Sequence, residues 1–302
     1  MKVSVCINTY RRSESLSGLL DDLALQQRMP DQVVVVDNDA AGSARAVIER
    51  HRASRPAFPI DYDVQPQRNI ALTRNRTVAL ASGDWLAFID DDERAPVDWL
   101  RRLLDAVALY RADGVLGPVD PRVPADAPAW IQRGRFYDFA RQPSGAPVPL
   151  NCMRFGNVVL RGDLVRAEQP PFNPFFALGS GEDSDLLVRL VRRGARIVWC
   201  DEAVVLEPIE SKKLRLRWLL FRALSGGQDF ALKTVTGQYR PIGPVGRIVF
   251  FSRVLAQLAV AAVLSLLCWP FGRHRAVHWL IAAFANFGKL SVLWGGRYNA
   301  WA

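Results

Sequence analysis

The sequence predicts an α/β fold, a mixed and mostly parallel sheet flanked by helices, followed by an apolar helical segment at the C-terminus. Within the first 120 residues, short runs of apolar residues alternate with longer stretches in which apolar residues recur at helical spacing. This order of elements is typical of a sheet covered by helices on both faces. Beyond residue 210 the alternation stops and the chain becomes basic and apolar.

Short apolar runs in the first part of the chain predict strands at residues 3–7, 32–37, 60–64, 85–90 and 115–116. The run at 32–37 is continuous and β-branched, as expected of a strand that is covered on both faces. Between the runs, helical periodicity predicts helices at residues 13–27, 43–52, 69–81 and 96–111. The strand–helix–strand order favours parallel pairing.

Residues 117–150 are rich in proline and show no periodicity. The stretch is too long for an ordinary connection, which predicts a functional loop or lid. A second α/β portion follows, with strands predicted at 156–160 and 195–200 and a helix at 182–193. This helix has acids in its first turn, arginines in its last turn and Gly194 just beyond, all of which match the helix dipole.

Charge divides the chain near residue 210. The whole chain has a net charge of +9, but residues 211–302 hold 13 lysines and arginines and a single acid, Asp229. Residues 1–210 are therefore slightly acidic, and we predict two domains with the boundary at 210. Because the basic excess lies outside the α/β pattern, a nucleic-acid-binding function is disfavoured.

Two apolar stretches, at 248–271 and 276–294, predict that the C-terminal domain associates with a membrane. A spanning helix needs about 20 apolar residues, so the first is just long enough and the second is interrupted by Asn286 and Lys289. Basic residues before the first stretch favour the cytoplasmic side for the N-terminal domain. The basic residues 273–275 would lie outside in a spanning hairpin, a conflict that an in-plane hairpin avoids. Helices of a soluble core or an oligomer are the remaining alternative.

Polar side chains follow three of the predicted strands at the point where each strand ends. Residues 8–11 follow the first strand, 37–39 the second and 90–93 the fourth. Ligands of open α/β sheets bind at the carboxyl ends of the strands, so we expect these residues to share one crevice. No glycine-rich dinucleotide motif and no P-loop is present, so a phosphate-bearing ligand needs another anchor.

The acidic run Asp90, Asp91 and Asp92 provides such an anchor. Three neighbouring aspartates do not stay charged without a counter-charge. Mg²⁺ or Mn²⁺ held by carboxylate oxygens meets this need and bridges to substrate phosphates. The alternative is a solvated acidic turn before the next helix.

Five stretches in order, at residues 3–10, 34–38, 73–75, 83–92 and 181–186, resemble family 2 glycosyltransferases of the GT-A fold. The resemblance implies a catalytic domain in which residues 1–120 bind the nucleotide-sugar and 121–210 bind the acceptor and supply the base. Within the family, the chain is most similar to glucosyltransferases that build succinoglycan and other bacterial exopolysaccharides.

The resemblance implies roles for single residues in binding the nucleotide-sugar donor. Thr9 and Tyr10 would line the nucleotide pocket. Asp37, with Asp39 as the second candidate, would accept a hydrogen bond from the base. Arg74 would neutralise the diphosphate or hold the aspartates in place.

The same resemblance assigns the acidic residues. Asp90 and Asp92 would form the Asp-x-Asp element, with Asp92 in direct contact with Mg²⁺ or Mn²⁺ and Asp90 and Asp91 at the donor. Asp183 of the Glu182–Asp183 pair would be the general base. A carboxylate at a helix N-terminus is stabilised in its ionised form, ready to take a proton. Ordinary first-turn acids of a helix are the alternative interpretation of the pair.

The implied activity is inverting, metal-dependent transfer of a sugar from a nucleotide-sugar, of the UDP type, to a glycan or lipid-linked acceptor in the synthesis of bacterial surface polysaccharide. The implied location is the cytoplasmic face of the inner membrane. Leu214 replaces the glutamine of the Gln-x-x-Arg-Trp element of processive members, which favours the addition of one sugar per acceptor. Residues 212–222 carry five lysines and arginines and would bind either the diphosphate of the acceptor or anionic lipid.

Two alternatives belong to other classes of protein. One is a catalytically silent scaffold that binds nucleotide-sugars within a membrane assembly complex. The complete set of acids disfavours this reading. The other is a nucleotidyltransferase, which residues 8–12 disfavour because they lack the glycine expected after the first strand.

Overall fold

The computed structural model describes residues 1–54, 57–175, 181–239 and 241–295. Contacts divide the chain into two compact units. We call them the sheet unit, within residues 1–122, 139–175 and 182–208, and the helical unit, within residues 123–138, 181 and 209–295. Residues 123–138 thus pack with the C-terminal helices, although they were predicted as part of the first domain.

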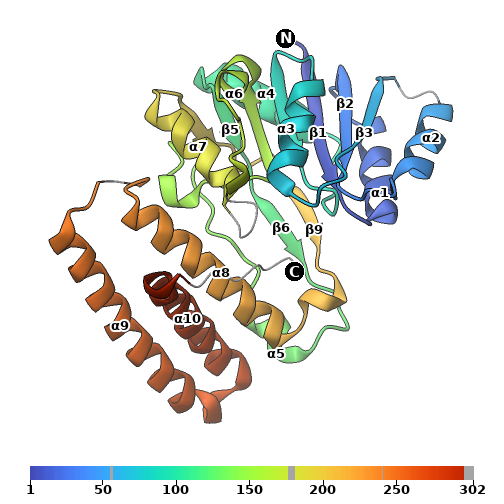
Figure 1. Ribbon diagram of the computed structural model, residues 1–302. Helices are drawn as coiled ribbons and strands as arrows, with labels where there is room; N and C mark the ends of the chain where they lie inside the picture. Colours follow the sequence, from blue (N-terminus) through green and yellow to red (C-terminus); the bar gives the residue numbers. More distant parts are fainter. Residues whose placement is uncertain (55–56, 176–180, 240, 296–302) are drawn as a thin grey trace. The chain divides into compact units, whose positions relative to one another are not determined.

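The core of the sheet unit is a seven-stranded sheet of strand order β3-β2-β1-β4-β7-β5-β8 (Figure 1). The strands are β1 Val3–Thr9, β2 Gln32–Asp37, β3 Ile60–Val64, β4 Trp85–Ile89, β5 Gly114–Leu116, β7 Asn157–Arg161 and β8 Ile197–Trp199. Only β7 runs antiparallel to its neighbours β4 and β5, and the other pairs are parallel. The predicted mixed, mostly parallel sheet is therefore confirmed.

Helices cover both faces of this sheet. They are α1 Ser13–Ala24, α2 Arg45–Ala53, α3 Ile70–Leu80, α4 Trp99–Tyr110, α6 Gly162–Ala167 and α7 Glu182–Arg192, with the 3-10 turn η1 Leu150–Cys152. The largest apolar cluster joins α1, α2 and α4 to side chains such as Val5 and Ile7 of β1. On the other face, Thr77 of α3 donates a hydrogen bond to Asn8. Successive side chains of a strand point to opposite faces, so α3 lies opposite α1.

The start of α3 follows from its sequence. The Asn69 side chain accepts a hydrogen bond from the Leu72 N–H at 3.1 Å, which caps the first turn. This cap fixes the position of Arg74, one turn further along the helix.

The prediction of a loop or lid at residues 117–150 was wrong in part. The stretch contains strand β6 Val119–Arg122 and helix α5 Ala129–Gly134. β6 pairs in parallel with β9 Val205–Pro208 to form a separate two-stranded sheet. This pairing joins segments that lie far apart in the sequence, and periodicity within one segment does not reveal it.

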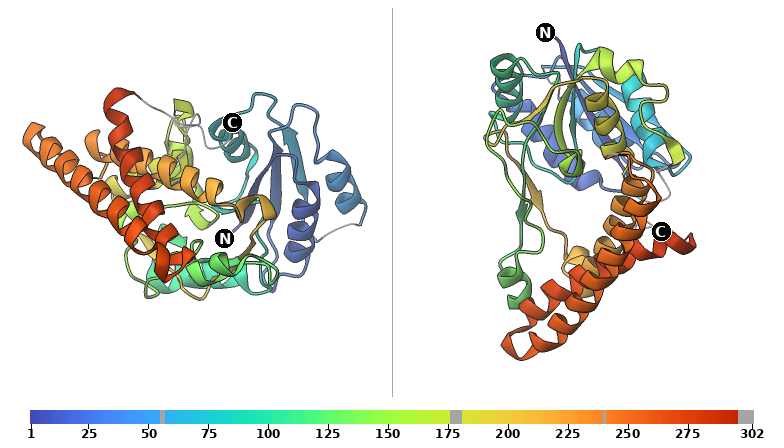
Figure 2. Two further views of the ribbon diagram at one scale, coloured as in Figure 1. Left: turned by 90° about the horizontal axis from the view of Figure 1, so that it is seen from below. Right: turned by 90° about the vertical axis from the view of Figure 1, so that its left-hand side faces the viewer.

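The helical unit is built around three long helices, α8 Leu216–Val235, α9 Pro244–Leu267 and α10 Arg273–Ser291. Short turns accompany them, namely η3 Ser211–Lys213, η4 Trp269–Phe271 and η5 Val292–Trp294. α10 packs against both α8 and α9 (Figures 1 and 2). A side chain at Gly227 would place its Cβ 2.0 Å from the Ala285 carbonyl oxygen, so only glycine permits this approach of α8 and α10.

A small apolar core joins α5 to α8 and α10. It contains Tyr137, whose hydroxyl donates to the Lys213 carbonyl at 2.7 Å and whose ring lies 5.9 Å from that of Trp218. Val277 of α10 and Leu219 of α8 are buried in the same cluster.

Two helices are long and apolar enough to cross a membrane, by length and composition alone. They are Pro244–Leu267, with a mean hydropathy of 2.0, and Arg273–Trp294, with a mean hydropathy of 1.4. Only 17% of the most apolar part of the first is buried within the chain. A helix of a soluble core is mostly buried, and most of the apolar part of α9 is not.

Candidate active site

The polar residues that follow β1, β2 and β4 meet at one edge of the sheet. Thr9 pairs with Asp37 in the register of β1 and β2, and β4 lies on the other side of β1. The Thr9 hydroxyl donates a hydrogen bond to Asp91 at 2.7 Å, which ties the end of β1 to the acidic turn after β4. The ends of β1, β2 and β4 therefore lie close together within the sheet unit.

Arg12 supplies the counter-charge of the acidic turn. Its Nη1 lies 2.9 Å from Asp91 Oδ1 and 3.2 Å from Asp92 Oδ2. Burial raises the pKa of Asp91, and the charge of Arg12 opposes that rise. Arg12 was not predicted as a site residue. Its position after β1, together with the need of the acidic turn for a counter-charge, could have predicted this role.

Arg74 connects two acidic segments that are distant in the sequence. Its Nη1 donates to Glu182 Oε1 at 2.8 Å, and its Nη2 lies 3.8 Å from Asp90 Oδ1. The guanidinium also stacks near the rings of Phe155 and Phe172, at 4.9 and 5.6 Å from their centroids. These contacts are those of a residue that holds the acids in place, and contact with a diphosphate stays a prediction.

Asp90 lies in a crowded, negatively charged environment. Desolvation raises its pKa to about 7, Arg74 opposes the rise, and the charges of Asp92, Asp91 and Asp183 add to it. Half of the side chain remains exposed. A carboxyl group with this combination of crowding and access favours the approach of a cation.

Asp183 lies in the first turn of α7, beside Glu182. Its Oδ2 accepts a hydrogen bond from the Phe155 N–H at 3.2 Å, and its Oδ1 accepts one from the Ser184 N–H at 2.7 Å. Its charge acts on both Asp90 and Arg74. The acids of the β4 turn and the predicted base therefore lie in one neighbourhood, and the role of Asp183 as base stays a prediction.

Asp37 is completely buried. Its carboxylate accepts hydrogen bonds from the Ala44 and Asp39 N–H groups at 2.8 and 2.9 Å, and from the hydroxyls of Ser43 and Tyr62. Two of these four donors belong to the backbone of the loop after β2. In this structure Asp37 shapes that loop, and its contact with a nucleobase stays a prediction.

Tyr10 lies between two cations at the end of β1. The guanidinium carbons of Arg11 and Arg68 lie 5.2 and 5.0 Å from the centroid of its ring. Arg11 also donates to Asp39 at 3.0 Å, and this bond, together with the charge of Arg11, lowers the pKa of Asp39 despite partial desolvation. The Arg11 side chain is 64% exposed. Asp39 itself is buried, so Arg11 is the exposed member of this pair.

The acidic turn has the donor chemistry that a hard divalent cation requires. Asp90 and Asp92 offer carboxylate oxygens, and a Cβ at Gly156 would lie 3.4 Å from Asp90 Oδ2, on a side that glycine leaves open. Among the described residues, no group of three or more histidine, cysteine or acidic side chains is arranged to hold a metal. Mg²⁺ commonly takes one or two carboxylates and completes its shell with water and phosphate oxygens, so two aspartates fit.

The comparisons with known proteins identify the family of the chain. The sequence model described as glycosyl transferase family 2 matches residues 4–164. The chain therefore belongs to glycosyltransferase family 2, and it is a glycosyltransferase. The family predicted from the five sequence stretches is confirmed.

Within this family the chain is similar over nearly its whole length to the succinoglycan biosynthesis protein ExoM of Rhizobium meliloti (strain 1021). The two are 32% identical over 298 residues, which cover 98% of this chain and 94% of that protein. The galactofuranosyltransferase GlfT1 of Mycolicibacterium smegmatis is 27% identical over 220 residues, covering 68% of this chain and 70% of its own.

Solved structures show the same fold. The mannosyltransferase PcManGT from Pyrobaculum calidifontis, in complex with GDP-Man and Mn²⁺, has a TM-score of 0.68 at 17% identity, covering 97% of this chain and 87% of its own. Residues 1–349 of S. aureus TarS in complex with UDP have a TM-score of 0.54 at 16% identity, covering 99% and 93%. At this identity the likeness concerns the fold alone.

Proposed function

We propose that this glycosyltransferase is inverting and adds one sugar from a UDP-linked donor to a glycan or lipid-linked acceptor during the synthesis of bacterial surface polysaccharide. The observation that carries the proposal is the link from Asp90 through Arg74 to Glu182, the residue beside Asp183. It brings the acids after β4 and the acid at the start of α7 to one neighbourhood. An in-line displacement needs the acids after β4 at the leaving phosphate and the acid of α7 at the attacking hydroxyl.

Asp183 takes the proton of the acceptor hydroxyl as that oxygen attacks the anomeric carbon. The hydrogen bond from the Phe155 N–H orients its carboxylate and leaves lone pairs on the same oxygen for the incoming proton. Arg74 holds Asp90 and Glu182 at fixed positions and reduces the repulsion between the two acidic segments. No covalent intermediate on the chain is required.

Asp90 and Asp92 are the residues that would hold Mg²⁺ or Mn²⁺. Such an ion, when bound, neutralises the charge that develops on the departing phosphate. Arg12, which contacts Asp92, keeps that carboxylate at the turn. The Mn²⁺ in the complex of the structurally similar mannosyltransferase supports this proposal.

We assign the contact with the uracil base to Asp39 and the shaping of the surrounding loop to Asp37. Asp39 is buried, but its partner Arg11 is exposed and can move aside for a ligand. The donors to Asp37 include two backbone N–H groups, which cannot leave without unfolding the loop. Of the two structurally similar complexes, that of TarS holds UDP and that of the mannosyltransferase holds GDP-Man, so the nucleotide is the part of the proposal that the donor screen tests.

The acceptor side of the proposal rests on the likeness to ExoM, whose name states a role in succinoglycan biosynthesis. Leu214 in place of glutamine supports single addition. The exposed apolar face of α9 supports attachment to the inner membrane at its cytoplasmic face. The anionic surface of that membrane complements the basic residues 212–222.

The decisive experiment screens UDP-, GDP- and dTDP-sugars by thermal shift with and without Mn²⁺, and then measures nucleotide release with the donor selected. Stabilisation by one UDP-sugar that requires Mn²⁺, followed by release of UDP on addition of an acceptor, supports the proposal. Product of the opposite anomeric configuration to the donor establishes inversion. Binding of the donor without turnover on any acceptor would favour the scaffold alternative.

A further inference from the structure

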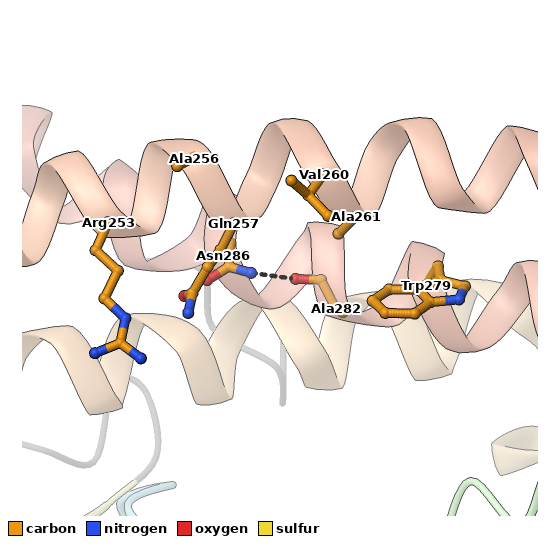
Figure 3. A pocket seen from close by; sticks show the side chains of 8 residues that line it. All are labelled: Arg253, Ala256, Gln257, Val260, Ala261, Trp279, Ala282 and Asn286. Atoms are coloured by element: carbon orange, nitrogen blue, oxygen red, sulfur yellow. Dashed lines mark hydrogen bonds between the residues drawn. The ribbon is translucent and has the colours of Figure 1, made fainter.

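A groove of about 470 Å³ lies between α9 and α10 in the helical unit (Figure 3). Arg253 lies at one end, Trp279 lies toward the other, and Gln257 and Asn286 lie between them (Figure 3). The rest of the lining is small and apolar, namely Ala256, Val260, Ala261 and Ala282. The groove is thus cationic and polar at one end and apolar along the rest of its length.

A second cation lies beside the polar end. The Lys289 ammonium donates to Asn286 Oδ1 at 3.0 Å, and Asn286 is itself held by a hydrogen bond from its Nδ2 to the Ala282 carbonyl, also at 3.0 Å. Arg253 and Lys289 are close enough for their charges to repel each other. Arg253 and Lys289 therefore both lie at the polar end of the groove.

Acidic side chains are scarce in this part of the sequence. Residues 230–302 contain no aspartate and no glutamate, and the one acid of the C-terminal region, Asp229, pairs with Lys233 at 2.8 Å. Charged side chains on membrane-associated helices are costly unless an anion or water compensates them. Arg253 is exposed, so water or an anion from outside these helices can compensate its charge.

The apolar part of the groove is exposed, as is the apolar face of α9 beside it. Val260 and the neighbouring Leu255 and Val263 are 55, 59 and 54% exposed. A ligand of this groove therefore carries an anion at one end and a hydrocarbon chain at the other. A guanidinium is well suited to a phosphate group, which it binds through two parallel hydrogen bonds.

We propose that this groove is a binding site for one anionic glycerophospholipid, with its phosphate at Arg253 and Lys289 and one acyl chain along Ala256, Val260 and Ala282. Gln257 is placed to bond the glycerol oxygens. The bound lipid supplies the missing negative charge and covers the gap between the two helices. The inference rests on the proposed membrane attachment and is independent of the proposed reaction.

The test uses the full chain purified in a neutral detergent and measures bound lipid by native mass spectrometry. Phosphatidylglycerol is titrated against phosphatidylcholine of the same acyl length. The wild-type chain is expected to retain one phosphatidylglycerol and to prefer it over phosphatidylcholine by at least tenfold. The pair of substitutions Arg253→Gln and Lys289→Gln is expected to abolish this preference.

Two further variants separate a built site from general attraction to negative charge. Arg275→Gln removes a charge from an exposed position of α10 that does not line the groove, and it should leave the preference intact. Ala256→Phe fills the groove without changing charge, and it should weaken retention at least fivefold. The thermal midpoint of each variant in detergent confirms that it is folded.

Equal retention of the two lipids by the wild-type chain would overturn the proposal. So would an equal loss in Arg253→Gln and Arg275→Gln, which would indicate nonspecific charge. A polyprenyl diphosphate that displaces phosphatidylglycerol at a hundredfold lower concentration would assign the groove to a lipid-linked acceptor instead. A dimer that Ala256→Phe dissociates would assign it to a second copy of the chain. None of these outcomes depends on sugar transfer, so the proposed reaction is tested independently of this lipid site.

Discussion

Arg74 of α3 and Glu182 of α7 form a buried ion pair with a separation of 2.8 Å, although they lie 108 positions apart in the sequence. Each side chain is less than a tenth exposed. The pair fixes the start of α7, and with it Asp183, relative to the sheet edge that carries Asp90. The geometry of the candidate active site therefore depends on one guanidinium group.

Arg74→Ala should impair both stability and activity. Removing one member of a buried ion pair costs about 3–5 kcal/mol. We expect a loss of this size in urea unfolding and a fall in turnover of at least about a hundredfold. Arg74→Lys keeps the charge but loses the planar fork, so it should recover stability in part and turnover little. Turnover of the wild-type level in Arg74→Ala would contradict the role given to this residue.

Asp183→Asn should remove turnover while leaving the donor bound. An amide keeps the size of the side chain and cannot accept the proton, and general bases contribute roughly 10²–10⁴ in rate. Steady-state nucleotide release and calorimetric donor binding measure the two effects separately. Asp185→Asn is the matched control on the same helix, because Asp185 pairs with Arg189 and is expected to affect stability alone. If the two variants lose turnover equally, Asp183 is not the base.

Glu93→Gln should stabilise the chain increasingly as the pH rises. Burial raises the pKa of Glu93 well above 4.5, and the charge of Asp90 adds to the rise. The folded state therefore holds this proton more tightly than the unfolded state, so its stability falls as the pH rises above about 4.5 toward the raised value. Glutamine does not titrate and avoids that loss.

Thermal unfolding in EDTA at pH 5 and pH 8 measures this difference. We expect the gain of Glu93→Gln over wild type to be about 2–6 °C larger at pH 8. Glu14→Gln, at an exposed position of α1, should show no such trend. A gain that is larger at pH 5 would mean that Glu93 is stabilised as its anion.

The two aspartates after β2 should respond differently to substitution. Asp37→Asn leaves at least one buried donor without its acceptor, which costs about 1–3 kcal/mol of stability. Asp39→Asn should lower the thermal midpoint less, because its side-chain partner Arg11 is exposed, and it should weaken binding of the UDP-sugar. A donor affinity that falls in Asp37→Asn, with the loop intact by its thermal midpoint, would return the base contact to Asp37.

The sheet was predictable because its strands carry continuous apolar runs. Strand β2 occupies the range predicted for it, since four consecutive valines between Gln32 and Asp37 permit little else. Strand β6 was missed because it is short, contains Pro121 and pairs only with a strand more than eighty residues away. Strand β6 forms because it pairs with β9, and its own residues do not indicate a strand.

The chemistry of the site was predictable from residue type and position after each strand, whereas the contacts were not. The acids after β4 and at the start of α7 stand out in the sequence. The place of Arg12 between Asp91 and Asp92, and the four donors that enclose Asp37, depend on where the loops after β1 and β2 turn. The conformations of these loops cannot be predicted from the residue pattern of a single sequence.

The backbone approach of Gly227 and Ala285 bears on how this protein is to be handled at the bench. α10 completes the small core that contains Tyr137. Truncating the chain before α9 would remove α10 and expose the apolar side of α8, so we expect the fragment to aggregate. Polar replacements on the outward side of α9, for example at Leu255, Val263 and Leu266, offer the better route to a detergent-free preparation.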